Sequence, residues 1–303
     1  MNDQSYVLIT AARNEEAHIE RTLQSISNQT CQPDMWVIIS DGSTDRTDAL
    51  VKEFAAARDF VRFIRIDNDG TRTFSSQAFA LNTGYDKVKD RSFDFVGFLD
   101  ADISLEPTYY EHLLKVFAAD PRLGVAGGEI FEPQSGRFAP RFGNSAQNVA
   151  GAIQFFRRQC FQDIGAAFVP LQYGGHDFVA NAMARKAGWE VRSISGLPVF
   201  HHRPTGTAGT TRCIMRFRVG LQDYYMGYEA LFAIGKCLRR VVEHPFGIGA
   251  VAQFLGYTLP WLTGRRRSVP EEFVDYLRQQ QLSRMFHRPV ESKPDKQTFR
   301  KTA

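Results

Sequence analysis

The chain has 303 residues, of which 43% are apolar and 13% aromatic, and its formal net charge is +4. This composition supports a packed core and excludes an intrinsically disordered chain, and the modest charge gives no reason to expect a nucleic-acid partner. The length exceeds that of one typical domain, so we expect a main domain with an appendage.

The first hundred residues alternate between strand-like and helix-like patterns. Apolar runs predict strands, and apolar residues at helical spacing predict helices between them. In chain order we expect a strand over 6–10, a helix over 16–28, a strand over 35–40, a helix over 47–57, a strand over 61–66, a helix carrying Phe74, Ala78 and Leu81, and a strand over 93–99. This alternation predicts an α/β fold with a mostly parallel, doubly wound sheet.

The middle of the chain is less regular. We expect a strand over 124–131, a helix over 177–187 and two short strands over 189–193 and 197–200. A polar segment over 204–211 follows, and it predicts a mobile loop that closes over a bound ligand.

The C-terminal third predicts helices in which aromatic residues alternate with arginines. An apolar run over 246–262 contains several glycines and Pro260, and it lies at the lower limit of length for a membrane span. Because Arg265, Arg266 and Arg267 follow it, we predict an interfacial or re-entrant segment in contact with an anionic membrane. The alternative is a buried helical hairpin that covers the sheet.

Two acidic clusters each follow a predicted strand. Asp41 comes directly after 35–40, and Asp100 and Asp102 come after 93–99. Ligands of open α/β sheets bind outside the carboxyl ends of the strands, so these carboxylates are expected at one shared site. Carboxylates one residue apart can bind Mg²⁺ or Mn²⁺, which in turn bind phosphate oxygens. The sequence therefore predicts a nucleoside diphosphate bound through a divalent cation.

Four motifs together resemble the ordered motifs of family 2 glycosyltransferases of the bacterial surface-polysaccharide type. They are Ile9-Thr10-Ala11-Ala12-Arg13-Asn14-Glu15-Glu16, Ser40-Asp41-Gly42-Ser43-Thr44-Asp45, Ala80-Leu81-Asn82-Thr83-Gly84 and Asp100-Ala101-Asp102. The resemblance implies the GT-A (Rossmann-like) fold and inverting transfer of a sugar from a nucleotide-sugar donor, with Mg²⁺ or Mn²⁺ as cofactor. It implies a catalytic domain over 1–204, to which we add a helical, membrane-associating extension over 205–290 and a disordered tail over 291–303.

The resemblance also implies roles for individual residues. Glu15 and Asp41 would hold the nucleoside of the donor, with Ala12 lining the base pocket and Asn82 and Asp100 also on the donor side. Asp102 would ligate the metal, and either His201 or His202 would complete the metal shell. A lysine that is frequent in the family is replaced by Gln77, so the contacts to the diphosphate are expected from two arginines, Arg72 and Arg203.

Inverting transfer requires a base for the acceptor hydroxyl. The resemblance points to Asp177 in Gly174-Gly175-His176-Asp177, at the start of a predicted helix whose dipole favours the ionised carboxylate. The alternative for Asp177 is a helix N-cap. His176 stands where the family usually has an acidic residue.

These observations favour a metal-dependent hexosyltransferase that acts on a saccharide or lipid-linked saccharide. Cys31, Cys160, Cys213 and Cys237 form no metal-binding spacing, and no signal peptide precedes the first strand, so we expect a cytoplasmic protein at the inner face of the membrane. The chain lacks the Gln-x-x-Arg-Trp motif of processive synthases, which favours single addition. The alternatives are a sugar nucleotidyltransferase and a non-catalytic carbohydrate- or lipid-binding protein.

Overall fold

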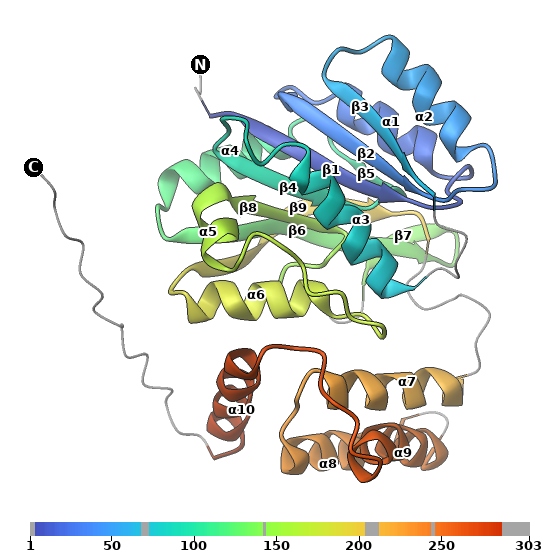
Figure 1. The fold of residues 1–303 in the computed structure, drawn as a ribbon, viewed down its shortest axis with the longest axis vertical. Coiled ribbons are helices and arrows are strands. Elements are labelled where there is room, and N and C mark those ends of the chain that lie inside the picture. The colour runs from blue at the N-terminus through green and yellow to red at the C-terminus, as the bar shows by residue number, and fades with distance from the viewer. Residues whose placement is uncertain (1–3, 68–72, 142–143, 204–211, 244–245, 287–303) are drawn as a thin grey trace, which may run out of the picture.

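The computed structural model describes residues 4–67, 73–141, 144–203, 212–243 and 246–286. In these ranges a nine-stranded sheet lies between helices, and a group of C-terminal helices packs below it in the view of Figure 1. Arg72, the predicted loop over 204–211 and the predicted tail over 291–303 lie outside the described residues.

The N-terminal half forms parallel strands with helices between them, as predicted. The strands are β1 (Tyr6–Ala12), β2 (Met35–Asp41), β3 (Val61–Ile66) and β4 (Phe95–Leu99), and the helices are α1 (Ile19–Ser27), α2 (Thr47–Ala56) and α3 (Phe74–Asp86). Every residue of β2 is buried, because both faces of a doubly wound sheet are covered. The strand order is β3-β2-β1-β4-β8-β6-β9-β5, with β7 paired to β6.

The second half of the sheet is mixed. Its strands are β5 (Ile103–Leu105), β6 (Leu123–Gln134), β7 (Arg137–Pro140), β8 (Ile153–Arg157) and β9 (Glu190–His201), and its helices are α4 (Tyr109–Ala119), α5 (Arg158–Asp163) and α6 (His176–Lys186). β6 and β9 run in the direction of β1–β4, whereas β5, β7 and β8 run against it. Most strands therefore share one direction, which confirms the predicted fold class.

Two short strands predicted over 189–193 and 197–200 form one continuous strand, β9. The pairing of β6 with β9 shifts register between Gly128 and Glu129, and Gly196 has a φ of 76°. The residues between the two predicted strands thus form a bulge within β9.

Apolar side chains form one core on each face of the sheet. One core contains Trp36, Tyr6 and Phe155, and the other contains Ile39, Phe98 and Phe161. The edge of the sheet where β1, β2 and β4 end carries the polar motifs instead.

The C-terminal extension consists of α7 (Arg212–Tyr225), α8 (Ala230–Arg239), α9 (Ile248–Leu262) and α10 (Glu271–Phe286). Helices α8 and α9 lie on the side of α7 that is away from the sheet (Figure 1). Helix α10 packs on α6, where Phe273, Val274 and Leu277 share an apolar cluster with Val179 and Ala182. No helix in the described ranges is both long and apolar enough to cross a membrane.

Two glycines allow α7 and α9 to cross closely. A Cβ atom on Gly220 would lie 2.0 Å from the carbonyl oxygen of Gln253, and one on Gly256 would lie 2.1 Å from that of Phe217. Neither backbone can move without separating the two helices.

We therefore expect Gly220→Ala to lower the free energy of unfolding by roughly 1–3 kcal/mol, because the new methyl group overpacks the helix crossing. Gly235→Ala in α8 is the matched control, since a Cβ there meets nothing within 4 Å. The control should stabilise the protein by about 0.5–1 kcal/mol, because alanine is the better helix former. Urea unfolding of both variants measures the difference, and equal stabilities would contradict the close crossing.

Candidate active site

The polar motifs meet at one edge of the sheet. Asp41 ends β2, Asp100 and Asp102 follow β4, and His201 ends β9. Strand β5 pairs antiparallel with the end of β9 and sets Ile103 opposite His201. Because Asp102 immediately precedes Ile103, this pairing brings the imidazole of His201 beside the carboxylate of Asp102.

Asp100, Asp102 and His201 form a group of potential metal ligands. One ligand atom from each lies within 4.8 Å of the others, and Nε2 of His201 lies 3.3 Å from Oδ1 of Asp102. Carboxylate oxygens suit Mg²⁺ and Mn²⁺, and imidazole is also accepted by Mn²⁺. The donor set therefore fits a divalent cation.

His202, the other histidine considered for the metal, lies outside this group. Its Nε2 is 2.8 Å from the hydroxyl of Ser104, and its ring packs edge-on against Phe138 at 5.5 Å. Burial and the nearby charge of Arg21 lower the pKa of His202, so its ring is a neutral packing group. The geometry favours His201 over His202 for the metal.

Arg203 connects the first motif to the fourth. Its Nε and Nη2 donate to Oδ2 of Asp102 at 3.0 and 2.8 Å, and its guanidinium also donates to Glu15. Burial alone would raise the pKa of Asp102, but the hydrogen bonds and charges of His201 and Arg203 outweigh it and lower the pKa to about 2. Asp102 is thus ionised near neutral pH, as a metal ligand must be.

Hydrogen bonds join the first two family motifs to each other. Asn14 has a left-handed backbone with a φ of 54°, and its side-chain oxygen accepts from the backbone N–H of Thr44 at 2.8 Å. The N–H of Glu15 donates to the hydroxyl of Thr47 at 2.7 Å. Asp41 is buried, and its Oδ2 lies 3.4 Å from a guanidinium nitrogen of Arg13.

The structure also shows what Ala12, Gln77 and Asn82 contact. Ala12 is buried in the core below the end of β1. Gln77, which replaces the lysine frequent in the family, donates to Oδ1 of Asp100 at 2.9 Å. The amide of Asn82 donates to and accepts from the backbone of Phe168, both at 2.8 Å, so it joins α3 to the chain before α6 and is not gathered with the acidic residues.

Asp177 lies in the first turn of α6, after the N-cap. The N-cap is Gly175, with a φ of 97° and no side-chain capping bond, so the structure does not support Asp177 as the cap. Oδ2 of Asp177 accepts from the N–H of Gly151 at 3.0 Å. His176 is buried against Phe168 at a ring distance of 5.2 Å.

Asp177 faces a cavity of about 160 Å³. Four of the residues that line this cavity have polar side chains that can hydrogen-bond to hydroxyl groups: Arg141, Asn144, Ser145 and Asn148. A carboxylate at a helix N-terminus, in a cavity with several donors, is suited to bind and deprotonate a hydroxyl.

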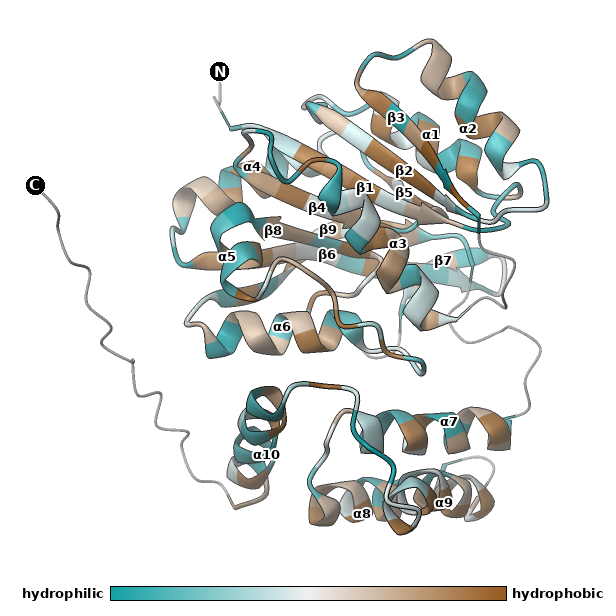
Figure 2. Ribbon diagram, in the orientation of Figure 1, coloured by the Kyte–Doolittle hydropathy of each residue, from teal (hydrophilic) through white to brown (hydrophobic). Residues whose placement is uncertain are grey.

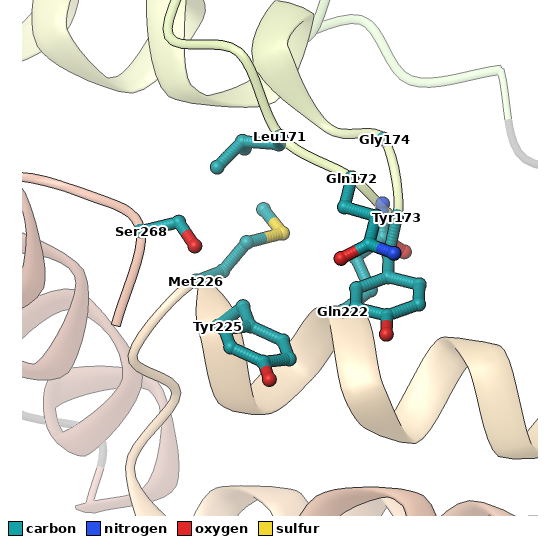
Figure 3. A pocket seen from close by; sticks show the side chains of 8 residues that line it. All are labelled: Leu171, Gln172, Tyr173, Gly174, Gln222, Tyr225, Met226 and Ser268. Atoms are coloured by element: carbon teal, nitrogen blue, oxygen red, sulfur yellow. The ribbon is translucent and has the colours of Figure 1, made fainter. Parts of the chain in front are cut away.

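A second, smaller cavity of about 60 Å³ lies between the chain before α6 and the C-terminal extension (Figure 3). Tyr173 stacks on Tyr225 of α7 with ring centroids 5.4 Å apart. Gln222 and Ser268 also line this cavity. The extension therefore contributes side chains next to the segment that leads to Asp177.

Glu132 was not identified from the sequence. It is buried at the end of the apolar part of β6, and its Oε1 lies 3.3 Å from Nδ1 of His201. A carboxylate on the far nitrogen of a metal-binding histidine fixes the tautomer and the ring orientation. The sequence carried a weaker signal, since Glu132 follows the predicted strand over 124–131 as Asp41 and Asp100 follow theirs, but Glu129 interrupts that strand's apolar residues.

We expect Glu132→Gln to weaken Mn²⁺ binding about tenfold, because a neutral amide orients and polarises His201 less than a carboxylate does. The Mn²⁺ dissociation constant is measured by electron paramagnetic resonance. Glu129→Gln on the same strand is the control, since Glu129 contacts the N–H of Gly196 and not His201. Equal Mn²⁺ affinities in both variants and the unaltered protein would show that Glu132 has no part in the site.

Comparisons with known proteins show the family to which the chain is similar. A family model described as glycosyl transferase family 2 matches residues 7–173. Poly-beta-1,6-N-acetyl-D-glucosamine synthases of Staphylococcus aureus (strain COL) and Staphylococcus epidermidis are each 27% identical to the chain over 175 and 176 residues. The matches cover 52% of this chain and 40% of each synthase, so the chain spans about two fifths of the length of these relatives.

Solved structures share the fold over almost the whole chain. A fragment of S. aureus TarS in complex with UDP-GlcNAc has a TM-score of 0.59 at 14% identity, and the match covers 95% of this chain and 93% of that one. The mannosyltransferase PcManGT from Pyrobaculum calidifontis, in complex with GDP-Man and Mn²⁺, has a TM-score of 0.55 at 15% identity, with coverage of 95% and 88%. The family match over more than half of the chain shows that this protein belongs to glycosyl transferase family 2, with a GT-A-like fold.

Proposed function

We propose that the protein is a metal-dependent, inverting hexosyltransferase that moves a sugar from a nucleoside diphosphate sugar to a hydroxyl of a saccharide or lipid-linked saccharide. The observation that carries the proposal is the convergence of Asp100, Asp102 and His201 at the edge of the sheet where the family motifs end. Two carboxylates and an imidazole within 4.8 Å of one another are a donor set that suits a divalent cation.

Each group has a defined part in donor binding. Asp100, Asp102 and His201 would hold Mg²⁺ or Mn²⁺, which when bound stabilises negative charge on the departing diphosphate. Arg203, whose positive charge is kept by Glu15 and Asp102, adds a cation beside the same phosphates. Asp41 and Glu15 hold the nucleoside, with Ala12, Asn82 and Arg72 as the remaining predicted donor positions.

Asp177 is the proposed base. Its carboxylate accepts the proton of the acceptor hydroxyl as that oxygen attacks the anomeric carbon from the face opposite the diphosphate. The polar side chains around the cavity, Arg141 and Asn148 among them, orient the acceptor. The N–H of Gly151 donates to Oδ2 and holds the carboxylate of Asp177 in place at the cavity.

We place the enzyme on the cytoplasmic side of a membrane, where it adds single sugars. Its four cysteines are free, in agreement with a reducing compartment. We propose a catalytic domain over 1–204, an extension over 205–290 and a tail over 291–303. The catalytic domain and the extension share an apolar cluster between α6 and α10. The extension therefore supports the helix that carries Asp177.

The test is to measure nucleoside diphosphate release from a panel of UDP-, GDP- and dTDP-sugars with Mn²⁺, with and without saccharide acceptors. We expect one donor to react, and proton NMR of the product to show an anomeric configuration opposite to that of the donor. Retained configuration would overturn the inverting mechanism. Binding of a donor with no release or transfer would favour the non-catalytic reading.

A further inference from the structure

The outer surface of α8 and α9 is the most apolar exposed region of the described chain. The six most exposed large apolar side chains all lie between positions 238 and 262, with exposed fractions of 63–77%: Leu238, Val242, Phe246, Ile248, Trp261 and Leu262. Figure 2 shows hydrophobic residues along these two helices, which lie farthest from the sheet. We call this surface the α8–α9 apolar face.

The spacing of the exposed residues defines one stripe on each helix. In α9 the exposed apolar positions 248, 251, 255, 259 and 262 follow intervals of three and four, and in α8 the positions 231, 234 and 238 do the same. The opposite stripe of α9, with Gln253, Gly256 and Tyr257, is buried against the rest of the extension. The apolar stripes therefore point away from the protein.

Buried polar contacts fix this orientation. Asp223 of α7 is buried and accepts from Lys236 of α8 at 2.7 Å and from Gln253 of α9 at 2.9 Å. The close crossing at Gly220 adds a steric constraint. Turning α8 or α9 to hide its apolar stripe would remove one partner of the buried carboxylate of Asp223, which is costly.

The charges beside the α8–α9 apolar face are mostly positive, and Glu243, the acidic residue next to Val242, pairs with Arg216. Positions 246–270 contain no Asp or Glu, and Arg265, Arg266 and Arg267 are exposed directly after Trp261 and Leu262. Arg239 is exposed in the last turn of α8. An apolar helical face with a tryptophan and arginines at its edge matches the chemistry of the boundary between acyl chains and anionic headgroups.

We propose that the α8–α9 apolar face lies in the plane of an anionic bilayer, with its side chains at the headgroup–acyl boundary and its arginines on the lipid phosphates. A second copy of the chain fits less well, because a symmetric contact would bring two arginine clusters together, and Glu243 within the face is already paired with Arg216. A bilayer supplies both the apolar layer and the negative charge.

This membrane contact rests on the proposed function, because it would bring the enzyme to a lipid-linked acceptor. Ser268, next to Arg267, lines the small cavity that Tyr173 and Tyr225 share (Figure 3). The arginine edge of the docked face therefore lies near the segment that leads to α6 and Asp177. A lipid-linked acceptor held in the bilayer would reach the proposed base from that side.

The test is co-sedimentation of the full chain with vesicles of phosphatidylcholine alone or mixed with phosphatidylglycerol, without any donor. We expect binding to the mixed vesicles and at least tenfold weaker binding for the combined variant Leu238→Ser, Val242→Ser and Trp261→Ser. The matched control, Leu238→Ile, Val242→Leu and Trp261→Phe, keeps the same positions apolar and should bind like the unaltered protein.

A second pair of variants tests the charge. Arg239→Gln with Arg266→Gln should weaken binding to the mixed vesicles about fivefold per arginine and leave binding to phosphatidylcholine unchanged. Arg62→Gln with Lys87→Gln removes the same charge from exposed sites on β3 and at the end of α3, and should have no effect.

Vesicle binding that is absent, or that is unaffected by the serine variant, would overturn the proposal. So would a dimer, seen by light scattering without lipid, that the serine variant abolishes while vesicles remain unbound. Binding of nucleoside diphosphate and Mn²⁺ is titrated separately on the same variants. Absence of vesicle binding by the unaltered protein, with intact nucleotide binding, would reject the docking alone, and vesicle binding without nucleotide binding would reject the proposed donor chemistry alone.

Discussion

Asp177→Asn is expected to lower the rate of sugar transfer roughly a thousandfold while leaving donor binding and thermal stability nearly unchanged. The amide has the shape of the carboxylate, and its oxygen can still accept from the N–H of Gly151, so the local structure should persist. The amide cannot take a proton from the acceptor hydroxyl, so the chemical step is lost. Steady-state transfer rates and donor titrations on the same preparation measure the two effects.

Asp275→Asn on α10 is the control for this substitution. Asp275 is exposed and outside the cavity that Asp177 lines, so the same chemical change there should leave transfer unaltered. A large loss of stability in Asp177→Asn with residual transfer would instead mean that Asp177 only supports the start of α6.

Asp102→Asn should abolish the dependence of donor binding on metal. Replacing a direct carboxylate ligand with an amide is expected to weaken Mn²⁺ binding by roughly a hundredfold or more, since even partners behind a ligand contribute 10- to 100-fold. Arg203 keeps its bond to Glu15 in the variant, so part of the network persists. Titration of Mn²⁺, and of nucleoside diphosphate with and without Mn²⁺, measures the effect.

The variant also needs a check of folding, because it removes one partner of a buried ion pair. We expect a lower melting temperature but a cooperative transition. Asp59→Asn, at an exposed site in the turn between α2 and β3, removes a carboxylate without touching the site and should bind Mn²⁺ normally. Unchanged Mn²⁺ affinity in Asp102→Asn would remove Asp102 from the metal site.

The strands and helices of the first hundred residues could be predicted because each has a strong local pattern. β2 is a continuous apolar run, and α1 places Ile19, Leu23 and Ile26 on one buried face. β8 has no such signal, because it is short and passes directly into α5 without a turn residue between them. The sequence predicts two strands in place of β9, and only the pairing with β6 shows that the strand continues through a bulge.

For the candidate site too, some residues could be predicted from the sequence and others could not. Asp41, Asp100 and Asp102 could be placed at strand ends from their position after apolar runs. The choice between His201 and His202 depends on the side to which each residue of β9 points, and a register shift of one residue reverses it. That register is set by β5 and by the bulge in the pairing with β6, which are contacts between distant segments. The contact between Glu132 and His201 depends on the same register.

The central claim is that this chain binds a nucleoside diphosphate through a divalent cation at Asp100, Asp102 and His201. Calorimetric titration of UDP, GDP and dTDP, each with Mn²⁺ and with a chelator, tests it most directly. We predict that one of the three binds in the presence of Mn²⁺ and that chelation lowers its affinity by at least tenfold. Binding of none of them, or binding of equal strength with and without metal, would contradict the claim.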